Sequence, residues 1–325
     1  MATDDSAESG AETGADSGAA ALNARHGLAD TLEFRVGPGG LLFAEVNNAQ
    51  ARASICLQGG QVLLWQPHTQ SNPVLWLSDA ARYAPGKAIR GGIPVCWPWF
   101  GSPAAPPGSA KPAGPAHGFA RTQSWRVDGT QALAGGQTRL RLRLADTPAT
   151  RALWPAAFAL ELQITIGDTL GLALRTSNTG ADPMVITEAL HTYFRIGDIG
   201  STKVEGLAGA RYFDAAGPAA GAGEARRAQD GAVHFDGEVD RVYDSGAPCW
   251  IDDLILQRRI HIAASGSAST VVWNPWDAKA QRLGDLGDDG WRRMVCVESG
   301  NARDCALSVA PGASHELGVR YRVES

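Results

Sequence analysis

The chain has 325 residues, of which 44% are hydrophobic and 19% are charged, so it can bury a sizeable core and is not disordered overall. The 29 Lys and Arg residues and 34 Asp and Glu residues give a net charge of −5, which argues against a nucleic-acid binder. No stretch approaches the about 18 apolar residues of a membrane-spanning helix, so no membrane partner is expected. The five cysteines are an odd and sparse set, which predicts no disulfide framework and favours a reducing, cytoplasmic compartment.

Residues 1–22 are mostly small or acidic, with five carboxylates and no Lys or Arg. The segment lacks the basic and apolar regions of a secretory signal. Because it has almost nothing to bury, we expect a disordered acidic tail over residues 1–22. A single domain is then predicted over residues 23–325, with ordered structure beginning near Leu28.

From Leu28 onward the dominant hydrophobic period is two residues, which is typical of half-buried strands. The clearest run alternates over 158–166 and is followed by Gly167-Asp168 and a second run over 170–174, which together predict a β-hairpin. Comparable runs occur at 32–36, 53–57, 62–64, 140–144, 260–262, 270–273, 294–297 and 317–323. Helical periodicity is confined to 147–153 and 277–286. With 39 Gly and 18 Pro to form turns, the sequence predicts one large antiparallel β-sandwich.

Generic nucleotide-binding, serine-hydrolase and zinc-protease motifs do not occur in the sequence. The histidines and cysteines do not cluster at metal-ligand spacing, so no metal site is predicted. The unusual feature is a set of polar residues within aromatic or Gly- and Pro-rich segments. In chain order these segments are Lys87–Gly101, His117–Arg121, Leu190–Phe194, Asp240–Tyr243, Val272–Trp276 and Val297–Asn301.

Together, these six segments resemble the aldose 1-epimerase (mutarotase) superfamily, and most closely its hexose-6-phosphate mutarotase branch. The resemblance spans roughly residues 28–323, and the segments follow one another in the order that the family shows. It implies a galactose-mutarotase-like β-supersandwich, which agrees with the two-residue period. It also implies exchange of the α and β anomers of a hexose 6-phosphate without a cofactor.

Anomer exchange needs a base that removes the proton of the C1 hydroxyl and an acid that protonates the ring oxygen. A carboxylate and an imidazolium are sufficient. The resemblance implies that Glu298 is the base and that His191 is the acid. The residues alone leave alternatives open. Glu298 could be solvated or paired with Arg292, Arg293 or Arg303, and His191 could be a core histidine bonded to backbone.

The resemblance also implies four substrate-binding residues, which are Arg90, Arg121, His117 and Asp240. Guanidinium groups suit bidentate binding of a phosphate, which favours Arg90 and Arg121 as its ligands. Each arginine could instead form a surface ion pair. Asp240 could pair with Arg241, and His117 could stabilise a turn.

One position departs from the family pattern. Ala116 stands where the hexose-phosphate branch often carries a glutamine that contacts substrate, and an alanine side chain cannot make that hydrogen bond. Trp97 and Trp99 fill aromatic positions of the family and could form a platform for the sugar or pack in the core.

Two other functions remain open at this stage. The first is a related enzyme that acts on free hexoses, against which the presence of both Arg90 and Arg121 argues. The second is a non-catalytic sugar-phosphate-binding or regulatory protein, against which the matched pair of Glu298 and His191 argues. No heptad or long apolar helix indicates assembly, so a monomer is expected.

Overall fold

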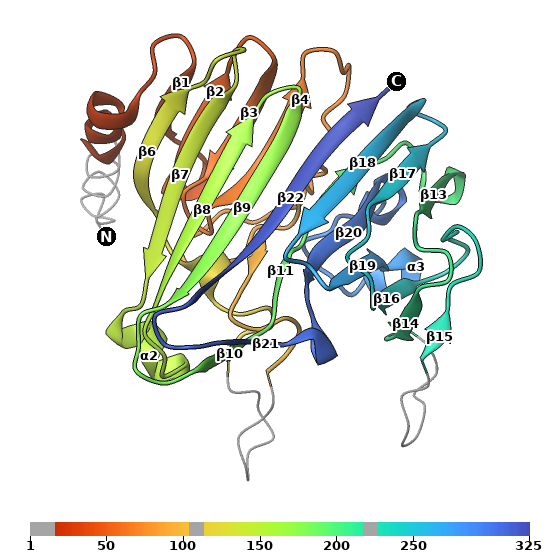
Figure 1. The fold of residues 1–325 in the computed structure, drawn as a ribbon. Coiled ribbons are helices and arrows are strands. Elements are labelled where there is room, and N and C mark those ends of the chain that lie inside the picture. The colour runs from red at the N-terminus through yellow and green to blue at the C-terminus, as the bar shows by residue number, and fades with distance from the viewer. Residues whose placement is uncertain (1–16, 104–113, 217–225) are drawn as a thin grey trace, which may run out of the picture.

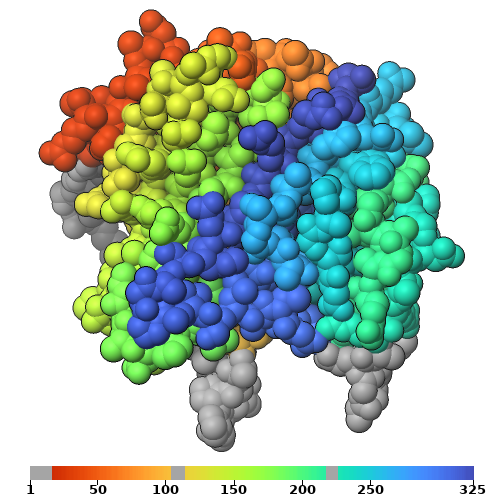
Figure 2. Space-filling model, viewed as in Figure 1, coloured from red at the N-terminus to blue at the C-terminus, as the bar shows by residue number. Residues whose placement is uncertain are grey.

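The computed structural model describes residues 17–103, 114–216 and 226–325, which form two layers of antiparallel β-sheet (Figure 1). One layer is an eight-stranded sheet that faces the viewer. Its strands, in spatial order, are β13 (Thr202–Glu205), β17 (Cys249–Asp253), β18 (Arg258–Ser265), β22 (Ser314–Glu324), β9 (Thr169–Asn178), β8 (Phe158–Ile166), β7 (Thr138–Ala145) and β6 (Arg126–Ala132). The dark-blue C-terminal strand β22 runs across the middle of this face and joins its two halves (Figure 2).

The second layer contains two sheets, and an isolated bridge pairs Val62 of the first sheet with Ile93, two residues before a strand of the second. The first has the order β1 (Leu32–Val36), β2 (Leu42–Asn47), β3 (Ala51–Cys56) and β4 (Gln61–Pro67). The second has the order β15 (Arg227–Ala228), β14 (Arg211–Asp214), β16 (Val239–Tyr243), β19 (Ser269–Asn274), β20 (Met294–Asn301), β11 (Glu188–Leu190) and β5 (Val95–Cys96), and β12 (Tyr193–Arg195) also pairs with β20. A separate ribbon pairs β10 (Met184–Ile186) with β21 (Leu307–Val309).

The core lies between the two layers, and the two-residue period of the sequence supplies it. Along β8 the residues alternate between buried and half-exposed, and β8 pairs with β9 through the predicted turn. Hydrogen bonds tie the layers together, because the indole nitrogen of Trp65 donates to the carbonyl of Gly167 at 2.9 Å and the hydroxyls of Thr192 and Tyr321 lie 2.7 Å apart. The predicted antiparallel β-sandwich is confirmed.

Helices are short and lie at the ends of the sheets. Helix α2 (Pro148–Leu153) was predicted, and Thr147 caps it by accepting a hydrogen bond from the backbone of Thr150. Helix α3 (Trp276–Ala280) is shorter than the predicted 277–286, because turns begin after Ala280. The described part of the chain also contains five 3₁₀ helices, which are Pro38–Gly40, Ala120–Thr122, Ile199–Ser201, Gly290–Arg293 and Arg303–Cys305. Within the described residues, no helix has the length and apolarity needed to span a membrane.

The N-terminal part of the chain differs from the prediction of a tail over residues 1–22. Residues 1–16 lie outside the described residues, but residues 17–26 form an α-helix in which Ala19 is buried. The side chain of Asn23 donates to and accepts from the backbone of Phe34, both at 2.7 Å, and so fastens the helix to β1. The prediction of disorder is therefore wrong for residues 17–22, because a few apolar and amide contacts suffice to dock this Ala-rich segment.

Candidate functional site

A cavity of about 550 Å³ opens on the face of the β16–β19–β20 sheet that points away from the core. The two-residue period decides which side chains reach it. Val272 and Val297 belong to the core, whereas their strand neighbours Val271, Trp273 and Glu298 line the cavity. The register pairs Val271 directly with Glu298, so adjacent strands present one continuous floor.

His191 and Glu298 meet on this floor. Glu298 lies in the middle of β20 and is 1% exposed, while His191 directly follows β11 and is 7% exposed. The His191 Nδ1 atom lies 3.3 Å from Glu298 Oε1. The backbone N–H of His191 donates to the carbonyl of Pro94 at 3.0 Å, which fixes the histidine between β11 and β12. An imidazole and a carboxyl group therefore face one space.

The surroundings disfavour charge on both members of the pair. Burial raises the pKa of Glu298 well above its usual value, and the carboxylate of Asp240 raises it further. Burial lowers the pKa of His191 well below its usual value, and nearby His117, Arg121 and Arg90 act in the same direction. Both shifts favour the neutral form of each group, that is, the protonated carboxyl group and the neutral imidazole.

Two arginines form a positively charged wall of the cavity. The Nε atom of Arg90 donates to Asp285 Oδ1 at 3.1 Å, and its Nη1 atom donates to the hydroxyl of Tyr193 at 2.9 Å. Arg121 lies in the 3₁₀ helix Ala120–Thr122 and donates from Nη2 to the carbonyl of Ala116 at 2.8 Å. A guanidinium has five N–H donors, so both arginines keep donors for an anion.

His117 stands beside the catalytic candidate His191, with ring centroids 5.4 Å apart and planes nearly perpendicular. Its φ of 61° places it in the left-handed region, and Gly118 follows with φ of 71°. The Nδ1 atom of His117 accepts a hydrogen bond from the backbone of Gly101 at 3.3 Å. Burial, aided by Arg121, lowers the pKa of His117 to about 4, so its neutral ring carries the remaining proton on Nε2.

Asp240 reaches the cavity from β16 and pairs with Lys279 of α3 at 3.2 Å. Lys279 also contacts Glu238 at 2.6 Å, so two carboxylates share its charge. Burial raises the pKa of Asp240, and Lys279 opposes that shift. The alternative partner Arg241 instead donates to Gln229, so the alternative Asp240–Arg241 pair does not form.

The structure brings all six predicted site residues into this one cavity, while the roles assigned to them remain predictions. They are His191, Glu298, Arg90, Arg121, His117 and Asp240. The tryptophans predicted as an alternative platform do not line it, because Trp97 is fully buried and the indole nitrogen of Trp99 donates to the carbonyl of Pro115.

Several lining residues were not predicted as site residues from the sequence. The apolar wall consists of Phe100, Phe213 and Trp273, and further cations come from Lys279 and Arg303. The guanidinium of Arg303 lies 3.6 Å from the ring centroid of Phe213. Trp273 could have been found, because it lies in one of the six quoted segments, whereas Phe213 carries no local signal.

One group of metal-ligand donors occurs among the described residues, at the candidate pair itself. Donor atoms of His191, Cys296 and Glu298 lie within 4.8 Å of one another, and all three residues are buried. Cys296 and Glu298 are two positions apart on β20, whereas His191 comes from a distant part of the sequence, so spacing could not indicate the cluster. Burial raises the pKa of the Cys296 thiol well above its usual value, and a protonated thiol is a poor metal ligand. The donor set suits acid/base chemistry better than metal binding.

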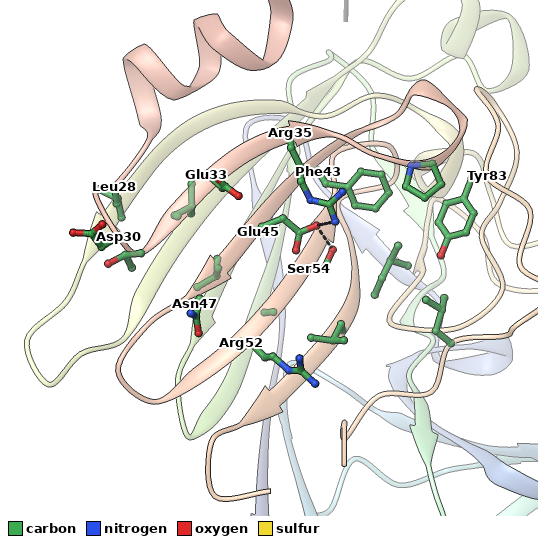
Figure 3. A pocket seen from close by; sticks show the side chains of 18 residues that line it. Leu28, Asp30, Glu33, Arg35, Phe43, Glu45, Asn47, Arg52, Ser54 and Tyr83 are labelled. Carbon is green, nitrogen blue, oxygen red and sulfur yellow. Dashed lines mark hydrogen bonds and ion pairs between the residues drawn. The ribbon is translucent and has the colours of Figure 1, made fainter. Parts of the chain in front are cut away.

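A larger hollow of about 900 Å³ lies over the β1–β4 sheet (Figure 3). There Arg35 donates to Glu45 at 2.6 Å, and the hydroxyl of Ser54 donates to the same carboxylate oxygen at 2.9 Å. Its described lining contains no histidine or cysteine. This hollow therefore lacks the acid/base pair of the smaller cavity.

Comparison with known proteins gives a consistent result. A family model described as aldose 1-epimerase matches residues 44–322. A protein of Escherichia coli (strain K12) named "Putative glucose-6-phosphate 1-epimerase" is 38% identical over 260 residues, which cover 80% of this chain and 83% of that protein. A protein of the same name from Cenchrus ciliaris is 35% identical over 270 residues, with coverage of 80% and 78%.

Solved structures share the same architecture. The crystal structure of a protein from Salmonella typhimurium described as a "putative mutarotase (YeaD)" aligns with a TM-score of 0.82 and 33% identity, over 92% of this chain and 96% of that chain. A galactose mutarotase-like protein from Lactobacillus casei ATCC 334 aligns with a TM-score of 0.67 over 87% and 100% of the two chains. At 14% identity, the second match shows a common fold alone.

Proposed function

The chain belongs to the aldose 1-epimerase family and is thus an isomerase of the mutarotase type, and we propose that it interconverts the α and β anomers of hexose 6-phosphates, with glucose 6-phosphate as a substrate. One observation carries this proposal. An imidazole–carboxyl pair and two arginines line the same 550 Å³ cavity. A free hexose has no group that requires the arginines.

The His191–Glu298 pair performs the two proton transfers of ring opening. The Glu298 carboxylate takes the proton of the C1 hydroxyl while the His191 imidazolium gives its proton to the ring oxygen. The C1–O5 bond breaks, the aldehyde rotates, and closure on the other face of C1 returns both protons. The pair ends each cycle with the single proton with which it began.

The phosphate anchors the substrate and adjusts the pair. Arg90 and Arg121 hold the dianion by charge-assisted hydrogen bonds. Both arginines lower the pKa of His191. A bound dianion offsets their positive charge and so raises the pKa of His191. Substrate binding thereby eases formation of the imidazolium that ring opening needs.

The sugar hydroxyls contact His117 and Asp240, which flank the pair on different elements. His117 donates through Nε2, since its Nδ1 accepts from Gly101. The Ala116 side chain offers no hydrogen bond, and its carbonyl instead holds Arg121. Sugar recognition here therefore depends on fewer side-chain donors than in relatives with glutamine at this position.

Coupled-dehydrogenase or polarimetric assays on freshly dissolved α anomers test the proposal. We expect the enzyme to accelerate equilibration of α-glucose 6-phosphate far more than that of α-glucose. Equal acceleration of both sugars would identify an aldose 1-epimerase of free hexoses. Tight binding of the phosphate without acceleration would identify a non-catalytic binding protein.

We also propose that the enzyme is a cytoplasmic monomer. The five cysteines are all free, which suits a reducing compartment. The residues of the proposed acid/base pair and phosphate site lie together in one cavity of the chain. Light scattering at assay concentration tests the oligomeric state.

A further inference from the structure

Tyr193 on β12 lies behind the cavity wall and contacts two of its functional groups at once. Its side chain is 2% exposed and does not itself line the cavity. The hydroxyl accepts a hydrogen bond from Arg90 Nη1 at 2.9 Å. The ring stacks on the imidazole of His191, with centroids 4.8 Å apart and planes 8° from parallel.

The surroundings hold Tyr193 rigidly. Trp76 stacks against it at 5.8 Å, and Trp273 meets it edge-on at 6.1 Å. The register pairs Tyr193 with Cys296, two residues before Glu298 on β20. A side chain packed by two indoles and paired to a central strand has little rotational freedom, so the groups that it contacts are held as well.

Core packing alone does not explain the hydroxyl. A phenylalanine would fill the same apolar space, whereas a buried hydroxyl requires a hydrogen-bond partner to offset its desolvation. Burial raises the pKa of Tyr193, so its oxygen stays a neutral phenol at physiological pH. Arg90 supplies the partner and is in turn held by Asp285 at 3.1 Å.

We propose that Tyr193 is a positioning residue that couples the phosphate-binding arginine Arg90 to the acid/base residue His191. Its hydroxyl fixes the position of the Arg90 guanidinium, and its ring fixes the plane of the His191 imidazole. Because the phenol is rigid, it also fixes the spacing between these two groups. Phosphate held by Arg90 then places C1 and O5 at the His191–Glu298 pair. This inference rests on the proposed function for the identity of the substrate.

Two substitutions separate the two contacts. Tyr193→Phe removes the hydroxyl but keeps the ring, so we expect KM for glucose 6-phosphate to rise about 3- to 10-fold with kcat within about 3-fold of wild type. Tyr193→Leu removes the stacked ring as well, so we expect kcat to fall at least about 10-fold. A purely structural role would lower thermal stability and leave the kinetic constants per folded enzyme unchanged.

Tyr321→Phe is the matched control. Tyr321 is also a fully buried tyrosine, and its hydroxyl forms a 2.7 Å hydrogen bond with the hydroxyl of Thr192. Neither residue lines the cavity. We expect this variant to keep the wild-type KM. A KM effect of the same size in both variants, or no KM effect in Tyr193→Phe, would overturn the proposal.

A double-mutant cycle with Arg90→Ala tests the coupling itself. If the hydroxyl acts through Arg90, Tyr193→Phe should add less than about 2-fold to KM in the Arg90→Ala background. An undiminished effect in that background would contradict the coupling.

Calorimetric binding of inorganic phosphate separates this inference from the proposed function. If wild type does not turn over glucose 6-phosphate but binds phosphate more tightly than Tyr193→Phe does, the substrate assignment fails and the positioning role stands. If wild type turns over the substrate while both proteins bind phosphate equally, the positioning role fails and the function stands. If phosphate does not bind wild type at all, the role of Arg90 and with it the positioning role fail.

Discussion

Arg121→Ala tests whether the positively charged wall binds the substrate phosphate. Arg121 is the better choice of the two arginines, because the hydrogen bond of its side chain goes to the carbonyl of the exposed Ala116. Removing Arg90 would instead leave Asp285 and Tyr193 without their partner. The change at Arg121 therefore removes a ligand for the anion and leaves no buried group unpaired.

The expected magnitude follows from the strength of a hydrogen bond to a charged group, about 1.5–3 kcal/mol. That loss corresponds to a rise of about 10- to 100-fold in KM for glucose 6-phosphate. The phosphate takes no part in bond breaking, so its binding is shared by ground and transition states, and kcat should fall much less.

Initial rates with glucose 6-phosphate and with glucose, corrected for spontaneous anomerisation, measure the effect. Rates with unphosphorylated glucose should barely change in Arg121→Ala. Arg143→Ala provides a matched control, since Arg143 forms exposed ion pairs with Asp128 and Glu161 on the other layer. A wild-type KM in Arg121→Ala, or an equal loss with glucose, would refute the reasoning.

Two further predictions concern the pH dependence of activity and the stability of the fold. The His191–Glu298 pair is active with one proton, so kcat/KM should fall at low pH, where the pair gains a second proton on His191, and at high pH, where Glu298 loses the last one. Because Arg121 lowers the pKa of both residues, Arg121→Gln should move both limbs of the kcat/KM profile to higher pH. Limbs that stay in place would contradict this electrostatic effect of Arg121. Gly118→Ala should lower the free energy of unfolding by about 2–4 kcal/mol in denaturant melts, because φ is 71° and the new Cβ would lie 1.9 Å from the Trp97 carbonyl oxygen. Gly135 also has a positive φ, but a Cβ added there meets no atom within 4 Å, so Gly135→Ala should lower the free energy of unfolding by only about 1 kcal/mol. An equal loss in both variants would show that the close contact at Gly118 does not matter.

Local patterns predicted the sandwich because each strand carries its own signal. The alternation over 158–166 needs no distant information to indicate which face is buried, and the structure shows that alternation in β8. The helix over residues 17–26 was missed for the opposite reason. The hydrogen bonds between the Asn23 side chain and the backbone of Phe34 hold this helix in place, and no local pattern in an Ala-rich segment predicts such a contact.

Some residues of the candidate site could likewise be predicted from local sequence patterns, and others could not. Glu298 and His191 stand out locally as polar residues in apolar strands, and the family resemblance supplied their roles. The partners that tune the site are not local. Asp285, which accepts a hydrogen bond from Arg90, is 195 residues away from it in the sequence. Tyr193 has the sequence pattern of an ordinary core aromatic residue, and only the structure shows its contacts with Arg90 and His191.

The most direct measurement for the central claim is the rate of α-to-β exchange of glucose 6-phosphate by NMR exchange spectroscopy, for wild type and for the two variants Glu298→Gln and His191→Ala. General acid or base catalysis contributes about 10²- to 10⁴-fold, so each variant should lose that much in kcat above the spontaneous rate. Glu161→Gln, which alters an exposed carboxylate on the other layer, should exchange as wild type does. Near-normal exchange by Glu298→Gln or by His191→Ala would remove that residue from the proposed proton transfers.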